Sequence, residues 1–131
     1  MEPAERSVFV TKGPMRFGQR LGLRPERHAD YVRHHARIWP EIESAIRDAG
    51  IRNYSIFCLR TGSATANGGD ELFGYYEYVG PPSDYEARMR ALAEAPRMRE
   101  WWDLMEAMQI PHPRRAQGAW WASMDEVFHQ D

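Results

Sequence analysis

Residues 15–23 read MRFGQRLGL, and this stretch decides how the fold begins. Its large apolar side chains all fall on odd positions: Met15, Phe17, Leu21 and Leu23. Arg16 and Arg20 fall on even positions. Because successive side chains of a strand point to opposite faces of a sheet, this alternation predicts a half-buried strand with one face toward a core.

Prolines and a glycine divide the chain that follows this strand. Pro25 suits the first turn of a helix. Pro40 lacks a backbone donor and disfavours helical geometry at Trp39, so we expect a break there and a second helix over 40–49. Gly50 is a natural end for that second helix.

The remaining elements complete a β-α-β-β-α-β order in which a proline splits each helical part. They are a strand over 53–60, a glycine-rich loop over 61–70, a strand over 72–79, helices over 83–95 and 97–109, and a strand over 119–128. Ser83 and Glu86 have the spacing of a capping box at the start of the first of these helices. The order predicts an α+β, ferredoxin-like (split βαβ) antiparallel sheet with helices on one face. The other face is left open, and we therefore expect a homodimer.

Length and charge restrict the class of protein. A chain of 131 residues fits one domain, which we place at 15–131, after a leader of uncertain order at 1–14. A net charge of −2 gives no reason to expect a nucleic-acid or anionic membrane partner. No apolar run approaches the roughly 20 residues that a bilayer requires. Cys58 is the single cysteine, so no intrachain disulfide is possible, which fits a cytoplasmic protein.

Two pairs of residues could carry chemistry. Tyr31 and His35 are four positions apart on a predicted helix, so they lie one turn apart on one face, and His is the usual proton shuttle near neutral pH. Trp101 and Trp102 point about 100° apart on a helix, so one can fill the core while the other faces a cleft. Each pair could equally consist of packing residues. No set of histidines has a zinc spacing with a third ligand, so no metal is expected.

Two further features lie on predicted strands. Trp120 and Trp121 would point to opposite faces of the last strand, which predicts that one of them is exposed or at an interface. Cys58 lies in the middle of a predicted strand, where we expect a small buried hydrophobic side chain. Elsewhere in the chain, Gly68-Gly69 matches no dinucleotide-binding or phosphate-loop pattern, and no Ser-His-Asp arrangement is favoured by the spacing.

Four segments in the same chain order resemble the L-rhamnose mutarotase family. They are YVRHHARIWPE at 31–41, NYSI at 53–56, WWDLM at 101–105 and EVFH at 126–129. The resemblance covers about residues 16–129. It implies a ferredoxin-like homodimer, an isomerase that interconverts the α and β anomers of L-rhamnose and needs no cofactor. It also implies that His35 is the proton donor and that four side chains contact the monosaccharide: Tyr31, Tyr54, Trp101 and Trp102.

Other functions stay open at this point. The pair Ala36-Arg37 stands where the family often has Asn-Pro after its catalytic His, and this difference could alter the entrance to the site and so the sugar that is bound. L-fucose or another deoxyhexose is an alternative substrate. A sugar-binding domain without catalysis and a dimeric ferredoxin-like monooxygenase are alternative functions, because fold alone does not decide activity.

Overall fold

The computed structural model describes residues 13–61 and 69–131. Its elements are β1 (Met15–Leu23), a short 3-10 helix (Pro25–Arg27), α2 (His28–Ala36), α3 (Pro40–Asp48), β2 (Ile51–Leu59), β3 (Asp70–Tyr78), a second 3-10 helix (Pro82–Asp84), α4 (Tyr85–Ala93), α5 (Met98–Glu106), β4 (Gln109–Ile110) and β5 (Ala122–Met124). The predicted leader, 1–14, falls outside the described residues except for its last two positions, and the predicted loop, 61–70, is described only at its ends.

In the described residues the sheet has five strands, and every pairing is antiparallel. Four of them follow the order β2-β3-β1-β4, and β5 pairs with β1. β1 pairs along its whole length with β3, from Met15 opposite Tyr78 to Leu23 opposite Asp70. Its other edge is shared, because β4 pairs with residues 22–23 and β5 with residues 18–20. The strand predicted over 15–23 is therefore confirmed at the centre of the sheet.

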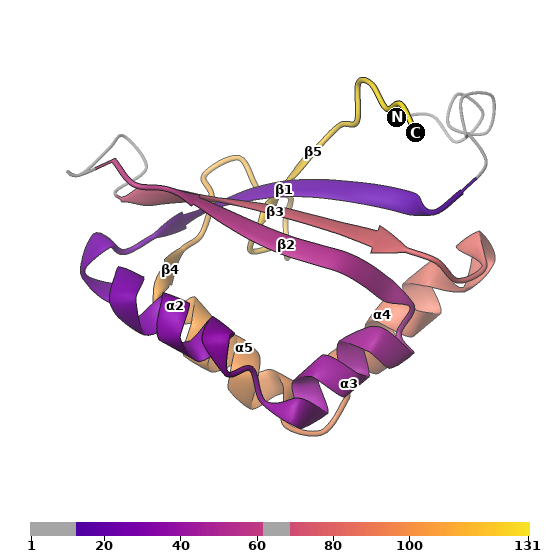
Figure 1. The fold of residues 1–131 in the computed structure, drawn as a ribbon, viewed down its shortest axis with the longest axis horizontal. Helices are drawn as coiled ribbons and strands as arrows, with labels where there is room; N and C mark the ends of the chain where they lie inside the picture. Colours follow the sequence, from indigo (N-terminus) through magenta and orange to yellow (C-terminus); the bar gives the residue numbers. More distant parts are fainter. Residues whose placement is uncertain (1–12, 62–68) are drawn as a thin grey trace.

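The α-helices of the described residues, α2 to α5, all lie on one face of this sheet, which curls over them (Figure 1). The core between the two layers contains apolar side chains from both: Leu21, Leu23, Ile42, Leu72, Met98, Met105 and Met108. The odd positions of β1 thus face the helices, as the alternation predicted. The architecture is α+β with an antiparallel sheet and helices on one face.

A β-bulge in β2 turns one tyrosine toward the helices. Arg52 pairs with Glu77 and Ser55 with Tyr75, so two residues of β2 lie opposite one residue of β3. Asn53 adopts a φ of 52°, a left-handed conformation that Asn tolerates better than most residues. Without this bulge the alternation would direct Tyr54 to the open face.

One detail of the helices differs from prediction. Pro82 begins a 3-10 turn, and the N-cap position of α4 is then Asp84, with no side-chain hydrogen bond at the cap. The capping box predicted for Ser83 and Glu86 is therefore wrong. Val32, next to Tyr31 on α2, is exposed, because only the narrow side of this short helix that carries Tyr31 packs on the core.

The predicted last strand, 119–128, is also wrong in extent. Ladder pairing is limited to Ala122–Met124. Beyond it the chain is tied to β1 by a side-chain ion pair, with Arg16 Nε 2.7 Å from Glu126 Oε2. Trp120 and Trp121, predicted to point to opposite faces, both pack as half-buried residues against the same core cluster, because they precede the strand and turn inward.

Candidate active site

α2 places Tyr31 and His35 one turn apart on its core-facing side. Tyr31 is only 5% exposed, and its ring centroid lies 4.4 Å from that of His35. Nδ1 of His35 is 2.8 Å from the backbone carbonyl oxygen of Tyr31. A carbonyl can only accept a hydrogen bond, so Nδ1 carries the hydrogen of the neutral ring. The lone pair of Nε2 is therefore the basic position of this imidazole.

The charge state of His35 follows from its surroundings. Burial lowers the pKa of His35 below its ordinary value of 6.5. The hydrogen bond to the Tyr31 backbone opposes this shift, and neighbouring His34 adds to the decrease. The ring is consequently neutral at pH 7, and it can accept a proton through Nε2 before it donates one.

α5 supplies an aromatic wall beside His35. The Trp101 ring is buried, and its centroid lies 5.7 Å from His35 and 5.1 Å from Trp39, in edge-on geometry in both cases. Arg97, just before α5, places its guanidinium 4.0 Å from the Trp39 ring centroid and 2.6 Å from a carboxylate oxygen of Glu41. These contacts tie the start of α5 to the start of α3 and hold Trp101 against His35.

Tyr54 on β2 brings a second phenol toward this region. The residue as a whole is 42% exposed, and its ring centroid lies 5.5 Å from that of Tyr76. Burial raises the pKa of Tyr54 to about 12, and a hydrogen bond with Gln19 opposes this increase. Burial also raises the pKa of Tyr31 well above its ordinary range, and Tyr54 adds to that increase. Both phenols therefore stay protonated at neutral pH and can form hydrogen bonds with a ligand.

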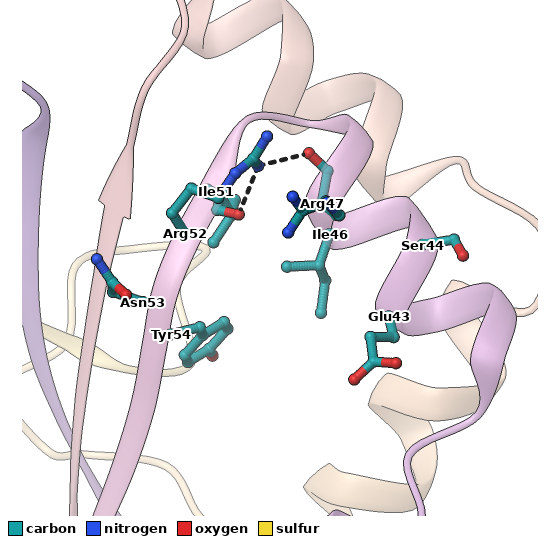
Figure 2. Close-up of a pocket in the computed structure, with 8 residues that line it drawn as sticks. All are labelled: Glu43, Ser44, Ile46, Arg47, Ile51, Arg52, Asn53 and Tyr54. Carbon is teal, nitrogen blue, oxygen red and sulfur yellow. Dashed lines mark hydrogen bonds between the residues drawn. The ribbon is translucent and has the colours of Figure 1, made fainter.

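A groove of about 430 Å³ opens between α3 and β2, next to Tyr54 (Figure 2). Its floor and walls come from the two elements: Glu43, Ser44, Ile46, Arg47, Ile51, Arg52, Asn53 and Tyr54. The Arg52 guanidinium closes one end by donating to the carbonyl oxygens of Arg47, at 2.8 Å, and Ile51, at 2.9 Å. We place the candidate site at the aromatic cluster around His35, because the groove lacks a group that can exchange a proton near pH 7.

A protein-family model described as L-rhamnose mutarotase matches residues 16–130. This chain belongs to the L-rhamnose mutarotase family. Two relatives named L-rhamnose mutarotase, from Yersinia pestis (strain Pestoides F) and Yersinia pseudotuberculosis (serotype O:1b, strain IP 31758), are each 33% identical over 109 residues, which is 83% of this chain and 91% of the relative. The crystal structure of an L-rhamnose mutarotase from Formosa agariphila is similar with a TM-score of 0.58 at 21% identity, over 89% of this chain and 99% of that one. That likeness shows a shared fold.

The family membership inferred from the four motifs is thus confirmed. Of the residues that the resemblance implies, the structure brings Tyr31, His35 and Trp101 into contact, and it places Tyr54 close enough to influence Tyr31 electrostatically. Trp102 is half-buried on the neighbouring side of α5, where the Arg99 guanidinium lies 5.4 Å from its ring centroid.

Sequence reasoning missed one buried polar residue of this mutarotase, Gln109. It donates from Nε2 to the Tyr31 hydroxyl oxygen at 2.9 Å and accepts from Trp120 Nε1 at 3.0 Å. In the sequence, Gln109 is the last residue of the helix predicted over 97–109, where a polar side chain is ordinary. What distinguishes it is that this polar side chain is buried, and burial is known only from the structure. Cys58 was expected to be buried and is exposed.

The described ranges, 13–61 and 69–131, contain neither a cluster of metal-binding side chains nor a membrane-spanning helix. No three side chains of His, Cys, Asp or Glu come together there in an arrangement that could hold a metal ion. None of the helices in those ranges is both long and apolar enough to cross a bilayer.

Proposed function

We propose that this chain interconverts the α and β anomers of L-rhamnose, with His35 as the proton-transfer residue. The observation that carries the assignment is the geometry of His35. Its Nδ1 is held on the Tyr31 carbonyl oxygen, at 2.8 Å, and its ring lies between the aromatic rings of Tyr31 and Trp101. A neutral imidazole fixed in this way presents Nε2 as a base with a defined orientation.

The reaction requires one proton to leave and one to arrive. As the bond between C1 and the ring oxygen breaks, the anomeric hydroxyl loses a proton and the ring oxygen gains one. His35 Nε2 accepts the first proton, and the resulting imidazolium returns it to the ring oxygen, so the open-chain aldehyde forms with no net change in protons. Rotation about the C1–C2 bond and the reverse steps close the ring with the opposite configuration. Proton transfer of this kind contributes about 10²–10⁴-fold.

The sugar contacts are assigned to the remaining residues of the site. The hydroxyls of Tyr31 and Tyr54 are suited to hydrogen bonds with sugar hydroxyls, and both stay protonated near pH 7 because burial raises their pKa values. Trp101 and Trp102 offer flat apolar faces for the C–H groups of the ring. Of the two, Trp101 contacts the His35 ring directly.

The test is NMR saturation transfer between the two anomeric protons, measured for L-rhamnose, L-fucose and D-glucose with and without protein. We expect faster exchange for L-rhamnose and its loss in His35→Ala. Faster exchange for another sugar only would keep the mechanism and change the substrate. Binding of sugar with no acceleration by the wild-type protein would favour a sugar-binding domain instead, and equal acceleration by wild type and His35→Ala would refute the role of His35.

We infer further that the fold is ferredoxin-like and that two copies cover the open face of its sheet. The strand order β2-β3-β1-β4, with antiparallel pairing throughout, supports the first inference. Phe57 and Leu59 support the second, because they are 65% and 54% exposed on the face opposite the helices. Analytical ultracentrifugation at micromolar concentration should give a dimer, and monomer alone would contradict this inference.

We propose the cytoplasm as the place where the chain acts. Its single cysteine, Cys58, is reduced and exposed, and it can form no intrachain disulfide. Cell fractionation checks this proposal, and recovery of the protein from an oxidising compartment would contradict it.

A further inference from the structure

Gln109 connects two side chains that approach from different parts of the chain. It lies on β4, is 4% exposed, and stands 78 positions after Tyr31 and 11 before Trp120 in the sequence. Its Oε1 accepts from Trp120 Nε1 at 3.0 Å, and its Nε2 donates to the Tyr31 hydroxyl oxygen at 2.9 Å. The amide is therefore used at both ends.

The donor and acceptor properties of the three groups allow only one direction of donation along this chain of hydrogen bonds. The indole nitrogen of Trp120 can only donate, so the amide must turn its oxygen toward Trp120. The amide nitrogen then faces Tyr31 and can only donate, so the Tyr31 oxygen is the acceptor. Within residues 13–61 and 69–131, Gln109 is the one hydrogen-bond partner of this hydroxyl. The proton of the Tyr31 hydroxyl is consequently directed to an acceptor other than Gln109.

We propose that Gln109 is a positioning residue that makes Tyr31 a hydrogen-bond donor to the sugar, with Trp120 fixing the orientation of the amide. The inference rests on the proposed function, and it names the residues that set the polarity of one sugar contact. Tyr31 would then bind an oxygen of the sugar rather than one of its hydroxyl hydrogens. A donor that is oriented before the sugar binds costs no reorientation during the reaction.

The same geometry predicts what an isosteric carboxyl group would do at this position. In Gln109→Glu, a protonated carboxyl group can accept from Trp120 and donate to Tyr31, as the amide does. An ionised carboxylate can only accept, so it would take the Tyr31 proton for itself. Burial raises the pKa of a carboxyl group above its ordinary value, which brings this change of state toward the neutral range.

Other groups near Tyr31 and Gln109 titrate as well, so the rate must be compared with wild type at each pH. They are His35 on α2, Tyr54 and Cys58 on β2, and Asp70 on β3, which pairs with Leu23 from the side opposite Gln109. All of them are present in both proteins. The ratio of variant rate to wild-type rate therefore isolates the carboxyl group introduced at position 109.

The experiment measures anomer exchange of L-rhamnose by wild type, Gln109→Glu and Gln109→Met from pH 5 to pH 9. The ionisation of the introduced carboxyl group is followed by its side-chain ¹³C chemical shift, and thermal unfolding confirms that each variant is folded. We expect the Gln109→Glu ratio to fall by about tenfold as the carboxyl group ionises, which is the effect of losing one well-formed hydrogen bond. Gln109→Met has a side chain of similar length without hydrogen-bonding groups. It should exchange the anomers more slowly than wild type, and its ratio of variant rate to wild-type rate should not change with pH.

Trp120→Phe is the matched variant for the orientation of the amide. Without the indole donor the amide of Gln109 can turn its oxygen toward Tyr31 and accept the phenol proton, so exchange should slow although Gln109 is intact. If Gln109 had only a structural role, Gln109→Glu would instead lower the rate of anomer exchange by the same factor at every pH.

Two results would overturn the inference. The first is a Gln109→Glu ratio that stays constant while the carboxyl group ionises. The second is a carboxyl group that stays protonated throughout together with a Gln109→Met rate equal to wild type. If wild type itself does not accelerate exchange, the proposed function fails and the inference fails with it, whereas an active wild type with either result above refutes the inference alone.

Discussion

Replacing His35 by either of two amides separates its structural hydrogen bond from its proton transfer. The amide nitrogen of Asn reaches the position of Nδ1, so His35→Asn can keep the bond to the Tyr31 carbonyl oxygen, at 2.8 Å in wild type. The amide of Gln reaches the position of Nε2 instead. Neither amide can accept and return a proton near neutral pH.

The structure predicts effects of different size on stability and on rate. His35→Asn keeps a hydrogen bond that contributes about 1 kcal/mol net, and it loses ring contacts with Tyr31 and Trp101. We therefore expect a fall of about 1 kcal/mol in the free energy of unfolding. Loss of proton transfer should slow anomer exchange by about 10²–10⁴-fold, or about 3–5 kcal/mol in activation free energy.

The assay combines urea unfolding with NMR exchange of L-rhamnose at pH 7. We expect His35→Asn to be folded and nearly inactive, and His35→Gln to be as inactive but less stable, because it loses the bond to the Tyr31 carbonyl oxygen. A folded His35→Asn that retains the wild-type rate within threefold would refute proton transfer by this ring.

Stability and pH give three further predictions. Burial opposes ionisation of Asp70, but hydrogen bonds from Thr61 and the charge of Arg60 hold the pKa of its carboxyl group below the ordinary range. Its contribution to the stability of the folded state is therefore present above about pH 4 and is lost as the pH falls through the folded pKa. Asp70→Asn should cost about 1–3 kcal/mol of unfolding free energy at pH 7, and a cost that does not shrink below pH 4 in urea titrations would contradict this account. The pKa of His35 is also lowered, but by burial, which disfavours the charged form of its ring. The unfolded state therefore binds the proton more tightly, and the stability of the folded state should fall as the pH drops below about 6.5. His35→Asn should lack this pH dependence. Trp101→Phe should slow exchange and lower the free energy of unfolding by about 1–3 kcal/mol. Trp102→Phe should cost less than about 1 kcal/mol in thermal unfolding, because this ring is only half-buried. Equal costs would contradict the difference in burial, and an unchanged exchange rate in Trp101→Phe would argue against the assignment of Trp101 to the site.

Much of the framework was determined by local chemistry that the sequence displays directly. The alternation over 15–23 predicts β1 with its correct face, because strand geometry depends only on neighbouring residues. Pro40 predicts the break between α2 and α3, because the ring of proline restricts the backbone wherever it occurs. The spacing of Tyr31 and His35 likewise places both on one side of α2 before any tertiary contact is known.

The arrangement of the site was decided only by tertiary structure. The bulge at Asn53 turns Tyr54 toward the helices, and a single extra residue in the pairing of two strands cannot be recognised in the periodicity of one of them. The hydrogen bonds of Gln109 join Tyr31 and Trp120 across large sequence separations. A buried polar side chain takes whatever partner the packing brings within reach, and that partner exists only once the sheet and helices have come together.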